Sequence, residues 1–444
     1  MHIVEQQLSD FIQQYPQNSR LLVAFSGGCD SIVLLHALHT LFPDRKPLAI
    51  HINHGLQAQS NDWARFCADY AHHKDIEFHL VEVQLDPKAA NIEERARIVR
   101  YQAFAAHMQA NDLLLTAHHQ DDQAETFLLQ LLRGAGLDGL GGIKPINDFP
   151  PGKLARPLLG LSRDQLEDYA RLNELKWVED PSNADTRFDR NFLRQQILPQ
   201  LQSRWPGAPR TIARAAQNCR EAAELVDSFA QQDLHYCLGA YQHSLSIEKL
   251  KQLSVARQHA LVRSWVKHND LPMPDRQMVE TICDELVNCR EDSEPVLKWS
   301  YVNLHRFKGF LYLIADDLHE KQEKIICELT PWDLSTGKLE LPFPVGRLLF
   351  EAAGEKQTVQ LGISFREPGQ SVKLVNASDH HKKLKKLFQT WSVPPWMRDH
   401  VPLLFINNEM IAIADYAKCS TSFQSNIDVI KWQLPEALDW RNNL

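Results

Sequence analysis

The feature that most constrains this chain is a strand–turn–helix pattern near its N-terminus. A β-prone apolar run at residues 21–25 precedes the hexapeptide Ser26-Gly27-Gly28-Cys29-Asp30-Ser31, and an apolar pattern of helical length follows it. Because glycine has no Cβ, the backbone of this turn can bend sharply and come close to an oxyanion. The N–H groups that open a helix bind phosphate oxygens. The pattern therefore predicts a phosphate-binding loop.

This loop differs from the Walker loop of P-loop nucleotidases, because the G-x-x-x-x-G-K-[ST] spacing and its lysine are absent. The Ser26 and Ser31 hydroxyls can donate further hydrogen bonds, and the Asp30 carboxylate can hold a magnesium ion. An ordinary tight turn is the alternative. The hexapeptide resembles the SGGxDS signature of the ATP pyrophosphatase (PP-loop) superfamily, whose members split ATP into AMP and pyrophosphate to activate an oxygen. The resemblance implies ATP-dependent adenylation.

The length of 444 residues predicts two or three domains. Apolar residues make up 44% of the chain and charged residues 23%, which is typical of a globular protein and excludes a fibrous one. No apolar run approaches the roughly 20 residues that cross a bilayer. Residues 1–5 also lack the basic and apolar pattern of a secretory signal. We therefore expect a cytoplasmic protein without a membrane partner.

The net charge of −8 argues against indiscriminate binding to nucleic acid, but a local basic patch can still bind a specific RNA. The eight cysteines are scattered, and none forms a C-x-x-C pair. This spacing predicts buried free thiols rather than a disulfide framework or a zinc site. It also argues against those tRNA thiolation enzymes of the PP-loop superfamily that need cysteine pairs.

Short β-prone runs alternate with longer amphipathic stretches through the first half of the chain. The predicted strands lie at residues 21–25, 48–52, 78–83, 113–116 and 154–157, and the predicted helices at 62–72, 92–109 and 124–133. Alternation of this kind predicts an α/β fold with a doubly wound, mostly parallel sheet, here of the PP-loop, adenine-nucleotide α-hydrolase-like type. Ligands bind outside the carboxyl ends of such strands.

The second half of the chain has a different pattern. Ser162 and Gln165 form a capping box that opens a helix, and a stretch at 211–237 without Pro or Gly predicts a long connecting helix. Helical patterns fill residues 245–290, strand-like runs follow at 296–304 and 310–314, and a further helix is predicted at 381–391. The expected domains are a catalytic α/β domain at 1–212, a mainly helical middle domain at 213–330, a linker at 331–356 and a small α+β domain at 357–444.

Two further segments carry candidate ligand-binding groups. His54 lies in the sequence HINHGL at residues 51–56, for which a structural turn is an equal alternative. Arg97, Arg100 and Tyr101 are three or four residues apart, so they share one face of a helix. Two guanidinium groups and an aromatic ring suit phosphate binding and base stacking. A solvated basic helix is the alternative.

The most specific segment after the first loop is TAHHQDDQAET at residues 116–126. The end of a strand, two histidines and the start of a helix place Asp122 and Glu125 on one turn. Such a pair of carboxylates can bind an ammonium group or a metal ion. A solvated acidic helix start is the alternative, because carboxylates are favoured at that end of the helix dipole.

Two basic clusters lie far apart in the sequence. The first contains Arg187, Arg190 and Arg194 at helical spacing. The second, which lies in the expected C-terminal domain, consists of Lys382, Lys383, Lys385, Lys386 and Arg398. A lysine run is most often a solvated helix face. Two such clusters in different domains, however, suit an extended polyanion better than a small substrate.

Together these segments resemble the tRNA(Ile)-lysidine synthetase family of bacterial tRNA-modifying enzymes. The matching sequences are SGGCDS, HINHGL, ERARIVRY, TAHHQDDQAETFLLQLLRGAGLDGL, WVEDPSN with RNFLR, and KKLKKLFQTWSVPPWMRDHVPLLF, in this order along nearly the whole chain. The resemblance implies a two-step reaction on the wobble cytidine of an isoleucine tRNA with a CAU anticodon. ATP adenylates the cytidine C2 oxygen and releases pyrophosphate. Free lysine then attacks C2, AMP leaves, and lysidine forms.

The resemblance also implies roles for individual residues. ATP would bind at residues 26–31 and His54, with Mg²⁺ on Asp30, and L-lysine would bind at Asp122 and Glu125. Asp122 or a neighbouring histidine would accept the lysine proton. Arg97 or Arg100 would hold the cytidine or phosphates. The implied catalytic set is Asp30, Arg97, Asp122 and Glu125. The tRNA would contact Arg97, Arg100, Arg190, Arg194 and the second basic cluster. A homodimer is compatible with this scheme.

Two other classes of protein share part of the pattern. Another PP-loop enzyme, such as a tRNA thiolase or a glutamine-dependent synthetase, would carry the same hexapeptide. The chain lacks the cysteine pair of the former and the N-terminal catalytic cysteine domain of the latter. An RNA-binding protein without activity would explain the basic clusters, but not why residues 26–31 occur together with Asp122 and Glu125.

Overall fold

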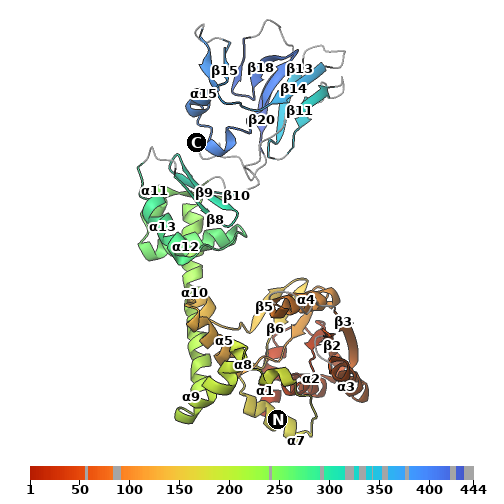
Figure 1. The fold of residues 1–444 in the computed structure, drawn as a ribbon. Helices are drawn as coiled ribbons and strands as arrows, with labels where there is room; N and C mark the ends of the chain where they lie inside the picture. The colour runs from red at the N-terminus through yellow and green to blue at the C-terminus, as the bar shows by residue number, and fades with distance from the viewer. Residues whose placement is uncertain are drawn as a thin grey trace. The chain divides into compact units, whose positions relative to one another are not determined.

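Figure 1 shows a computed structural model of the chain. It describes residues 1–55, 59–83, 92–239, 243–290, 295–315, 325–329, 337–342, 344–352, 359–375, 380–420 and 427–434. The chain divides into an N-terminal unit, Met1–Leu225, and a C-terminal unit, Val226–Leu444. This division lies inside helix α10 (Ala208–Cys237). The division into three domains and a linker stays a prediction.

A six-stranded sheet forms the centre of the N-terminal unit, in the order β3-β2-β1-β4-β6-β5. Its strands are β1 (Leu21–Ala24), β2 (Leu48–Asn53), β3 (Glu77–Glu82), β4 (Leu113–Leu115), β5 (Ile146–Phe149) and β6 (Gly152–Ala155). Only β5 is antiparallel to its neighbour among these strands, so the doubly wound, mostly parallel sheet is confirmed. Strand β5 was not predicted, because Asn147 and Asp148 are poor strand formers.

Successive residues of these strands point to opposite faces of the sheet and enter two separate hydrophobic cores. Val23 of β1 packs in one core and its neighbour Leu22 in the other. The first face is covered by α1 (Ile3–Ile12), α2 (Cys29–Leu41), α3 (Ser60–His73) and α7 (Arg163–Leu172). Helix α4 (Ile92–His107) covers the other face. Because both faces are buried at the centre of the sheet, β1 and β4 are apolar runs without alternation, whereas the outer strands β3 and β5 keep exposed polar residues.

The other helices of this unit lie in the connections between the strands or between α7 and α10. They are η1 (Pro43–Arg45), α5 (Gln120–Leu132), α6 (Leu137–Leu140), η2 (Pro181–Ala184), α8 (Asp189–Phe192), a π-helical turn η3 (Leu193–Ile197) and α9 (Leu198–Arg204). As predicted, Ser162 and Gln165 cap α7 reciprocally. Helix α5 begins at Gln120 rather than at the predicted Ala124, because the Asp122 carboxylate caps its first turn by accepting a hydrogen bond from the His119 N–H.

The first part of the C-terminal unit combines helices with a four-stranded antiparallel sheet, in the order β7-β10-β9-β8. Its elements are β7 (Ser244–Ser246), α11 (Ile247–Lys251), α12 (Val255–His268), α13 (Arg276–Thr281), a π-helical turn η4 (Ile282–Leu286), β8 (Val296–Trp299), β9 (Val302–Phe307) and β10 (Phe310–Ala315). The prediction of one strand at 296–304 is wrong, because Ser300 takes a φ of +49° and turns the chain into a hairpin.

The second part of the C-terminal unit contains three antiparallel sheets and one α-helix among its described residues. The strands are β11 (Ile325–Leu329), β12 (Lys338–Glu340), β13 (Arg347–Ala352), β14 (Val359–Ser364), β15 (Ser371–Val372), β16 (Lys382–Lys383), β17 (Leu403–Ile406), β18 (Glu409–Ile413), β19 (Ala417–Lys418) and β20 (Ile427–Gln433). The helices are α15 (Leu384–Thr390) and the 3₁₀ turn η6 (Pro395–Met397).

The predicted helix at 381–391 is shorter in the structure. Lys382 and Lys383 pair with β15 as strand β16, and the helix begins only at Leu384. Its apolar residues are buried while the lysines stay exposed. Strands β12 and β13 lie within the expected linker, of which residues 331–336, 343 and 353–356 lie outside the described residues. None of the described helices is long and apolar enough to cross a membrane.

Candidate active site

The predicted phosphate loop joins β1 to α2. Gly27 has a φ of +83°, and Gly28 precedes α2 in an extended conformation. Ser31 braces the turn, because its Oγ accepts a hydrogen bond from the Gly27 N–H at 3.1 Å and donates one to the Gly28 carbonyl at 3.0 Å. Ser26 is exposed, and its hydroxyl lies 3.1 Å from that of Ser31. The loop thus holds its shape through its own hydrogen bonds.

The two glycines of the loop have different reasons to lack a side chain. A Cβ on Gly27 would lie 2.8 Å from the Cys67 sulfur and 3.1 Å from Cγ2 of Val178, so protein atoms already fill that space. A Cβ on Gly28 would meet no atom of the described chain closer than the Ser26 hydroxyl, at 3.6 Å. Gly28 lines a cavity. The missing side chain at this position therefore leaves room for a ligand.

Cys29 contributes its backbone rather than its thiol. The side chain is buried in the hydrophobic core below the loop, and burial raises its pKa to about 12. A protonated thiol is a poor nucleophile and a poor metal ligand. The seven cysteines whose side chains the structure describes are all free, and five of them are buried.

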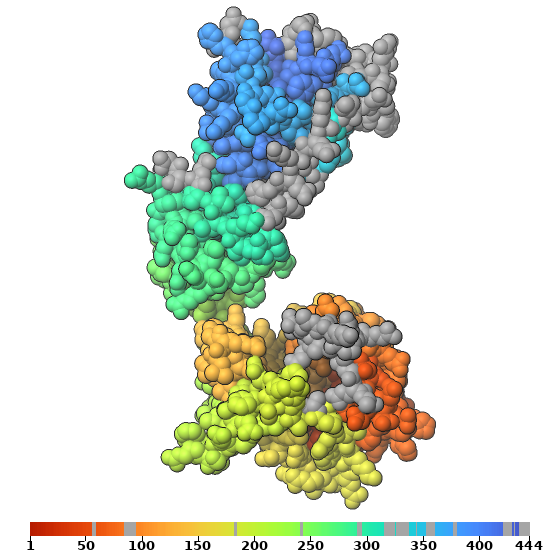
Figure 2. Space-filling model, in the orientation of Figure 1, coloured from red at the N-terminus to blue at the C-terminus, as the bar shows by residue number. Residues whose placement is uncertain are grey.

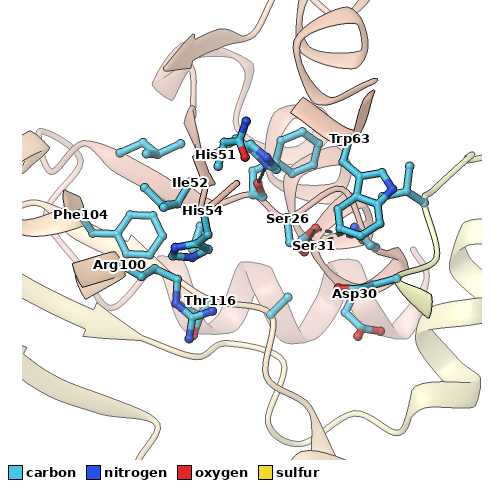
Figure 3. Close-up of a pocket in the computed structure, with 18 of the residues that line it drawn as sticks. Ser26, Asp30, Ser31, His51, Ile52, His54, Trp63, Arg100, Phe104 and Thr116 are labelled. Atoms are coloured by element: carbon cyan, nitrogen blue, oxygen red, sulfur yellow. Dashed lines mark hydrogen bonds between the residues drawn. The ribbon is translucent and has the colours of Figure 1, made fainter. Parts of the chain in front are cut away.

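The loop opens into a cavity of about 530 Å³, a volume within the range of small-molecule sites. Figure 2 shows dark red atoms from the start of the chain at the bottom of a hollow in this unit. In the close-up of Figure 3, Ser26, Ser31 and Asp30 lie together on one side of the cavity. The other side is formed by His54, Arg100 and Phe104.

The cavity brings together most of the side chains predicted for nucleotide and lysine binding. The predicted residues that line it are Ser26, Gly28, Asp30, Ser31, His54, Arg100 and Asp122. The predicted residues of this unit that are not among its lining residues are Gly27, Cys29, Arg97, Glu125, Arg190 and Arg194. Arg97 and Arg100 nevertheless share a face with Tyr101, as predicted, because their Cζ atoms lie 5.4 and 5.8 Å from the centre of its ring.

Trp63 and Val178 are among the residues of the cavity wall that were not predicted from the sequence. Trp63 reaches the cavity from α3, and its position among polar residues at the start of that helix was the available signal. Val178 reaches it from the segment after α7, where its N–H donates to the Gly27 carbonyl at 3.0 Å. Only the folded chain shows that this later segment packs against the phosphate loop.

Three carboxylates surround the buried ring of His119. Its Nε2 lies 3.6 Å from Oδ2 of Asp30 and 3.5 Å from Oδ2 of Asp122, and Nδ1 lies 3.5 Å from Oδ2 of Asp121. Burial lowers the pKa of His119, but hydrogen bonds to Asp121 and Asp30 outweigh it and raise the pKa to about 10. Burial also disfavours the charged form of Asp122 and would raise its pKa. The neighbouring His119, His118 and Arg190 outweigh this effect, so the pKa of Asp122 is lowered. The raised pKa of His119 favours the charged form of the ring, which attracts the carboxylates around it.

The Glu125 carboxylate is completely buried and has two arginine partners. Nε of Arg190 lies 2.8 Å from one of its oxygens and Nε of Arg194 lies 2.6 Å from the other. Arg194 also reaches Oδ1 of Asp122 at 3.1 Å. The predicted acidic pair therefore already binds two guanidinium groups. Arg187 lies outside α8 and pairs with Asp185, so the three arginines do not form one stripe.

The residues near the loop fit a magnesium ion that is held partly by the protein and partly by the phosphates of a nucleotide. Oδ1 of Asp30 is buried without a hydrogen-bond partner, and Asp30 lines the cavity beside the loop. Within the described residues, no group of three or more His, Cys, Asp or Glu side chains is placed to hold a metal ion by itself. Mg²⁺ typically binds through one or two carboxylates and completes its shell with phosphates and water. Asp30 is the carboxylate beside the loop that could hold such an ion.

The second basic cluster lies on the surface of the C-terminal unit. Its four lysines are exposed, and within the described residues they form no ion pair. Arg398 is only half-buried, but its Nε donates to the Val393 carbonyl at 2.9 Å. The lysines are therefore the free cationic groups of this cluster.

Comparison with protein families gives three matches in chain order: a PP-loop domain at residues 1–201, a TilS substrate binding domain at 245–312 and a TilS substrate C-terminal domain at 361–434. A tRNA(Ile)-lysidine synthase of Legionella pneumophila (strain Lens) is 37% identical over 94% of this chain and 96% of its own. That of Vibrio vulnificus (strain CMCP6) is 40% identical over 90% and 93%. The chain belongs to the tRNA(Ile)-lysidine synthase family.

Two solved structures with low sequence identity are also similar to part of this lysidine synthase family member. The U34-tRNA thiolase NcsA from Methanococcus maripaludis has a TM-score of 0.43 and 19% identity over 49% of this chain and 78% of that one. The NMN synthetase from Francisella tularensis has a TM-score of 0.29 and 12% identity over 49% and 92%. The family assignment depends on the sequence relatives and the family models.

In this lysidine synthase family member, alanine at the two loop glycines should have different effects. Gly27→Ala combines a positive φ with a clash, so we expect the free energy of unfolding to fall by about 2 kcal/mol or more. Gly28→Ala should change it by less than about 0.5 kcal/mol, yet weaken ATP binding because the methyl group enters the cavity. Chemical denaturation and calorimetric titration with ATP measure the two effects. Wild-type ATP affinity in Gly28→Ala would contradict this role of the loop.

Proposed function

We propose that this chain is a PP-loop enzyme of tRNA modification that ligates free L-lysine to the wobble cytidine of the isoleucine tRNA with a CAU anticodon, in the cytoplasm. ATP adenylates the C2 oxygen of the cytidine and releases pyrophosphate. The lysine ε-amine then forms a bond to C2, the bond from C2 to the adenylated oxygen breaks, and AMP leaves. The observation that carries the proposal is that one cavity contains the phosphate loop, a carboxylate and a cationic, aromatic wall.

The phosphate loop supports the first step. Its backbone N–H groups and the Ser26 hydroxyl can bind the phosphates that leave as pyrophosphate, and donors fixed in advance stabilise developing charge without reorganisation. Gly28 leaves space for this approach. Asp30 would hold Mg²⁺, which supplies positive charge to the phosphates when it is bound.

The wall formed by α4 supports binding of the cytidine. Arg100 and Phe104 line the cavity together with His54, and Arg97 stacks on Tyr101 next to them. Burial lowers the pKa of His54, so its ring is neutral near pH 7 and can donate or accept a hydrogen bond with a base. Aromatic rings and guanidinium planes are the usual partners of an unstacked RNA base. These groups therefore suit a flipped pyrimidine.

The acidic pair supports binding of the lysine. Asp122 is the member that lines the cavity, so it makes the direct contact with the ammonium group, while Glu125 holds Arg190 and Arg194 beside it. A lysine ammonium group in water has a pKa of about 10.4 and must lose a proton before the amine can attack. Asp122 or His118 accepts that proton. Burial lowers the pKa of His118 to about 4, so its ring is neutral at pH 7.

The experiment that tests the proposal is mass analysis of nucleosides from the isoleucine tRNA after incubation with the pure protein, ATP and lysine. We expect lysidine, with AMP release and repeated turnover only when both lysine and tRNA are present. With tRNA and ATP alone, pyrophosphate release should stop after about one equivalent per enzyme, because the adenylated cytidine has no lysine to react with. A requirement for a sulfur donor would instead indicate a thiolase, the alternative enzyme. Absence of turnover with all three substrates would leave an RNA-binding protein and contradict the proposal.

Glu125→Gln tests the lysine site. The amide keeps the shape but loses the charge that holds two arginines, so we expect the KM for lysine to rise at least tenfold and the KM for ATP to change by less than about threefold. Thermal unfolding would report any loss of stability separately. The control is Glu167→Gln, since Glu167 also pairs with two arginines, but these are Arg163 and Arg171 rather than the arginines beside Asp122. A larger rise in the KM for ATP than for lysine would contradict the assignment.

The exposed lysines of the C-terminal unit provide a test of tRNA binding. Replacing all four by Gln should weaken tRNA binding at least tenfold and reduce the salt dependence of the affinity, because each phosphate contact releases counterions. Titration of labelled tRNA at several salt concentrations measures both. The variant replaces Lys382, Lys383, Lys385 and Lys386. The control replaces the exposed lysines Lys46, Lys74, Lys153 and Lys176, which lie outside the two matched substrate domains. An unchanged salt slope would show that the cluster is ordinary surface.

A further inference from the structure

The N-terminal unit contains a second cavity, of about 440 Å³, whose lining residues are all different from those of the first. Helix α5 contributes to both: Asp122 lines the first cavity, whereas Gln120 and Gln123 line the second. The remaining wall of the second cavity comes from α1, from the segment after β6 and from the first turns of α10. None of the residues implied in the reaction above lines it.

Four arginines line this second cavity, and no acidic side chain does. They are Arg156, Arg210, Arg214 and Arg220. Within the described residues none of the four pairs with a carboxylate. Gln217, which lines the cavity, donates a hydrogen bond to Glu221 at 2.9 Å, and Glu221 itself does not line the cavity. The cavity thus carries an uncompensated positive charge.

Two of these arginines are fixed and two are free. Nη1 of Arg156 donates to the Lys144 carbonyl at 2.7 Å, and its Nε is buried without a hydrogen-bond partner. Nη1 of Arg220 donates to the Ile143 carbonyl at 2.8 Å. Arg210 and Arg214 are exposed, and no side-chain partner is formed for them in the described part of the chain. A buried guanidinium with an unused donor is costly unless an acceptor reaches it.

The free arginines lie in a row along the start of α10. Arg210, Arg214 and Gln217 follow one another at intervals of four and three residues, so they share one face and extend over about 10 Å of the helix. The positive end of the helix dipole adds to their charge, because Arg210 lies in the first turn. A row of this length is longer than one phosphate group and suits successive phosphates of a polynucleotide strand, which guanidinium groups bind bidentately.

We propose that this second cavity is a docking site for the sugar–phosphate backbone of RNA, separate from the site of the chemistry. The inference rests on the proposed function for the identity of the RNA, which is the tRNA substrate. A phosphate bound here contacts the glutamine side of α5, the helix whose acidic side faces the first cavity. Gln123 already fixes the following loop, with its Oε1 accepting from the Ile143 N–H at 2.6 Å. Docked RNA would therefore stabilise the helix that carries Asp122.

The test is tRNA binding by the double variant Arg210→Ala/Arg214→Ala between about 50 and 200 mM salt. We expect the affinity to fall at least tenfold at the lower salt concentration, the slope of log affinity against log salt to decrease by about 2, and the KM for ATP to stay unchanged. The charge-keeping variant Arg210→Lys/Arg214→Lys should restore the slope. The matched control Lys74→Ala/Lys176→Ala removes two exposed charges from the same unit and should leave the slope as in the wild type.

Inhibition by inorganic phosphate and by pyrophosphate tests whether the cavity binds a free anion instead of the RNA backbone. If the double variant binds tRNA like the wild type but is less inhibited by pyrophosphate, the cavity takes a free anion and the inference is wrong. The inference is also wrong if the double variant responds to tRNA, phosphate and pyrophosphate as the wild type does. An equal loss of tRNA affinity in the control variant would contradict it as well. The proposed function is tested independently by lysidine formation in the wild type. Lysidine formation with wild-type tRNA binding in the double variant would reject only this docking site.

Discussion

The proposed active site depends on the complete burial of the Glu125 carboxylate. Leaving a buried charge without its partner costs about 3–5 kcal/mol, so Arg190 and Arg194 have to lie beside it. These arginines belong to α8 and the π-helical turn η3, and their ion pairs fix this later segment against the start of α5. Turns of π-helix often occur at functional sites. The same ion pairs hold Asp122 at the edge of the cavity.

The stretch of chain between α7 and α9 supports both halves of the proposed reaction. Val178 in this stretch forms a hydrogen bond with Gly27 and packs where a side chain on that glycine would lie, so it helps to shape the phosphate loop. Arg190 and Arg194, about a dozen residues later, neutralise the acidic pair. One connecting segment therefore orders the groups proposed for the nucleotide and those proposed for lysine. This explains why neither the loop nor the acidic helix would form a complete site alone.

Much of the fold could be predicted because its signals are local. The apolar runs of β1 and β2, the capping box at Ser162 and the glycine turn at 26–31 are each encoded by adjacent residues. The features that were missed depend on contacts between distant segments. Trp63 and Val178 line the cavity only because α3 and the segment after α7 pack against the loop, and the arginine partners of Glu125 are more than sixty residues away. The hairpin at Ser300 was missed because residues 296–304 contain no glycine or proline, the strongest signals of a turn.

The most direct measurement of the phosphate loop's role is a crystal structure of the protein with α,β-methylene-ATP, which cannot be split between its first two phosphates. We expect the triphosphate to lie on the backbone N–H groups of residues 26–31, in the space that the missing side chain of Gly28 leaves open. A nucleotide bound with its phosphates away from this loop would contradict that role and the reaction proposed from it.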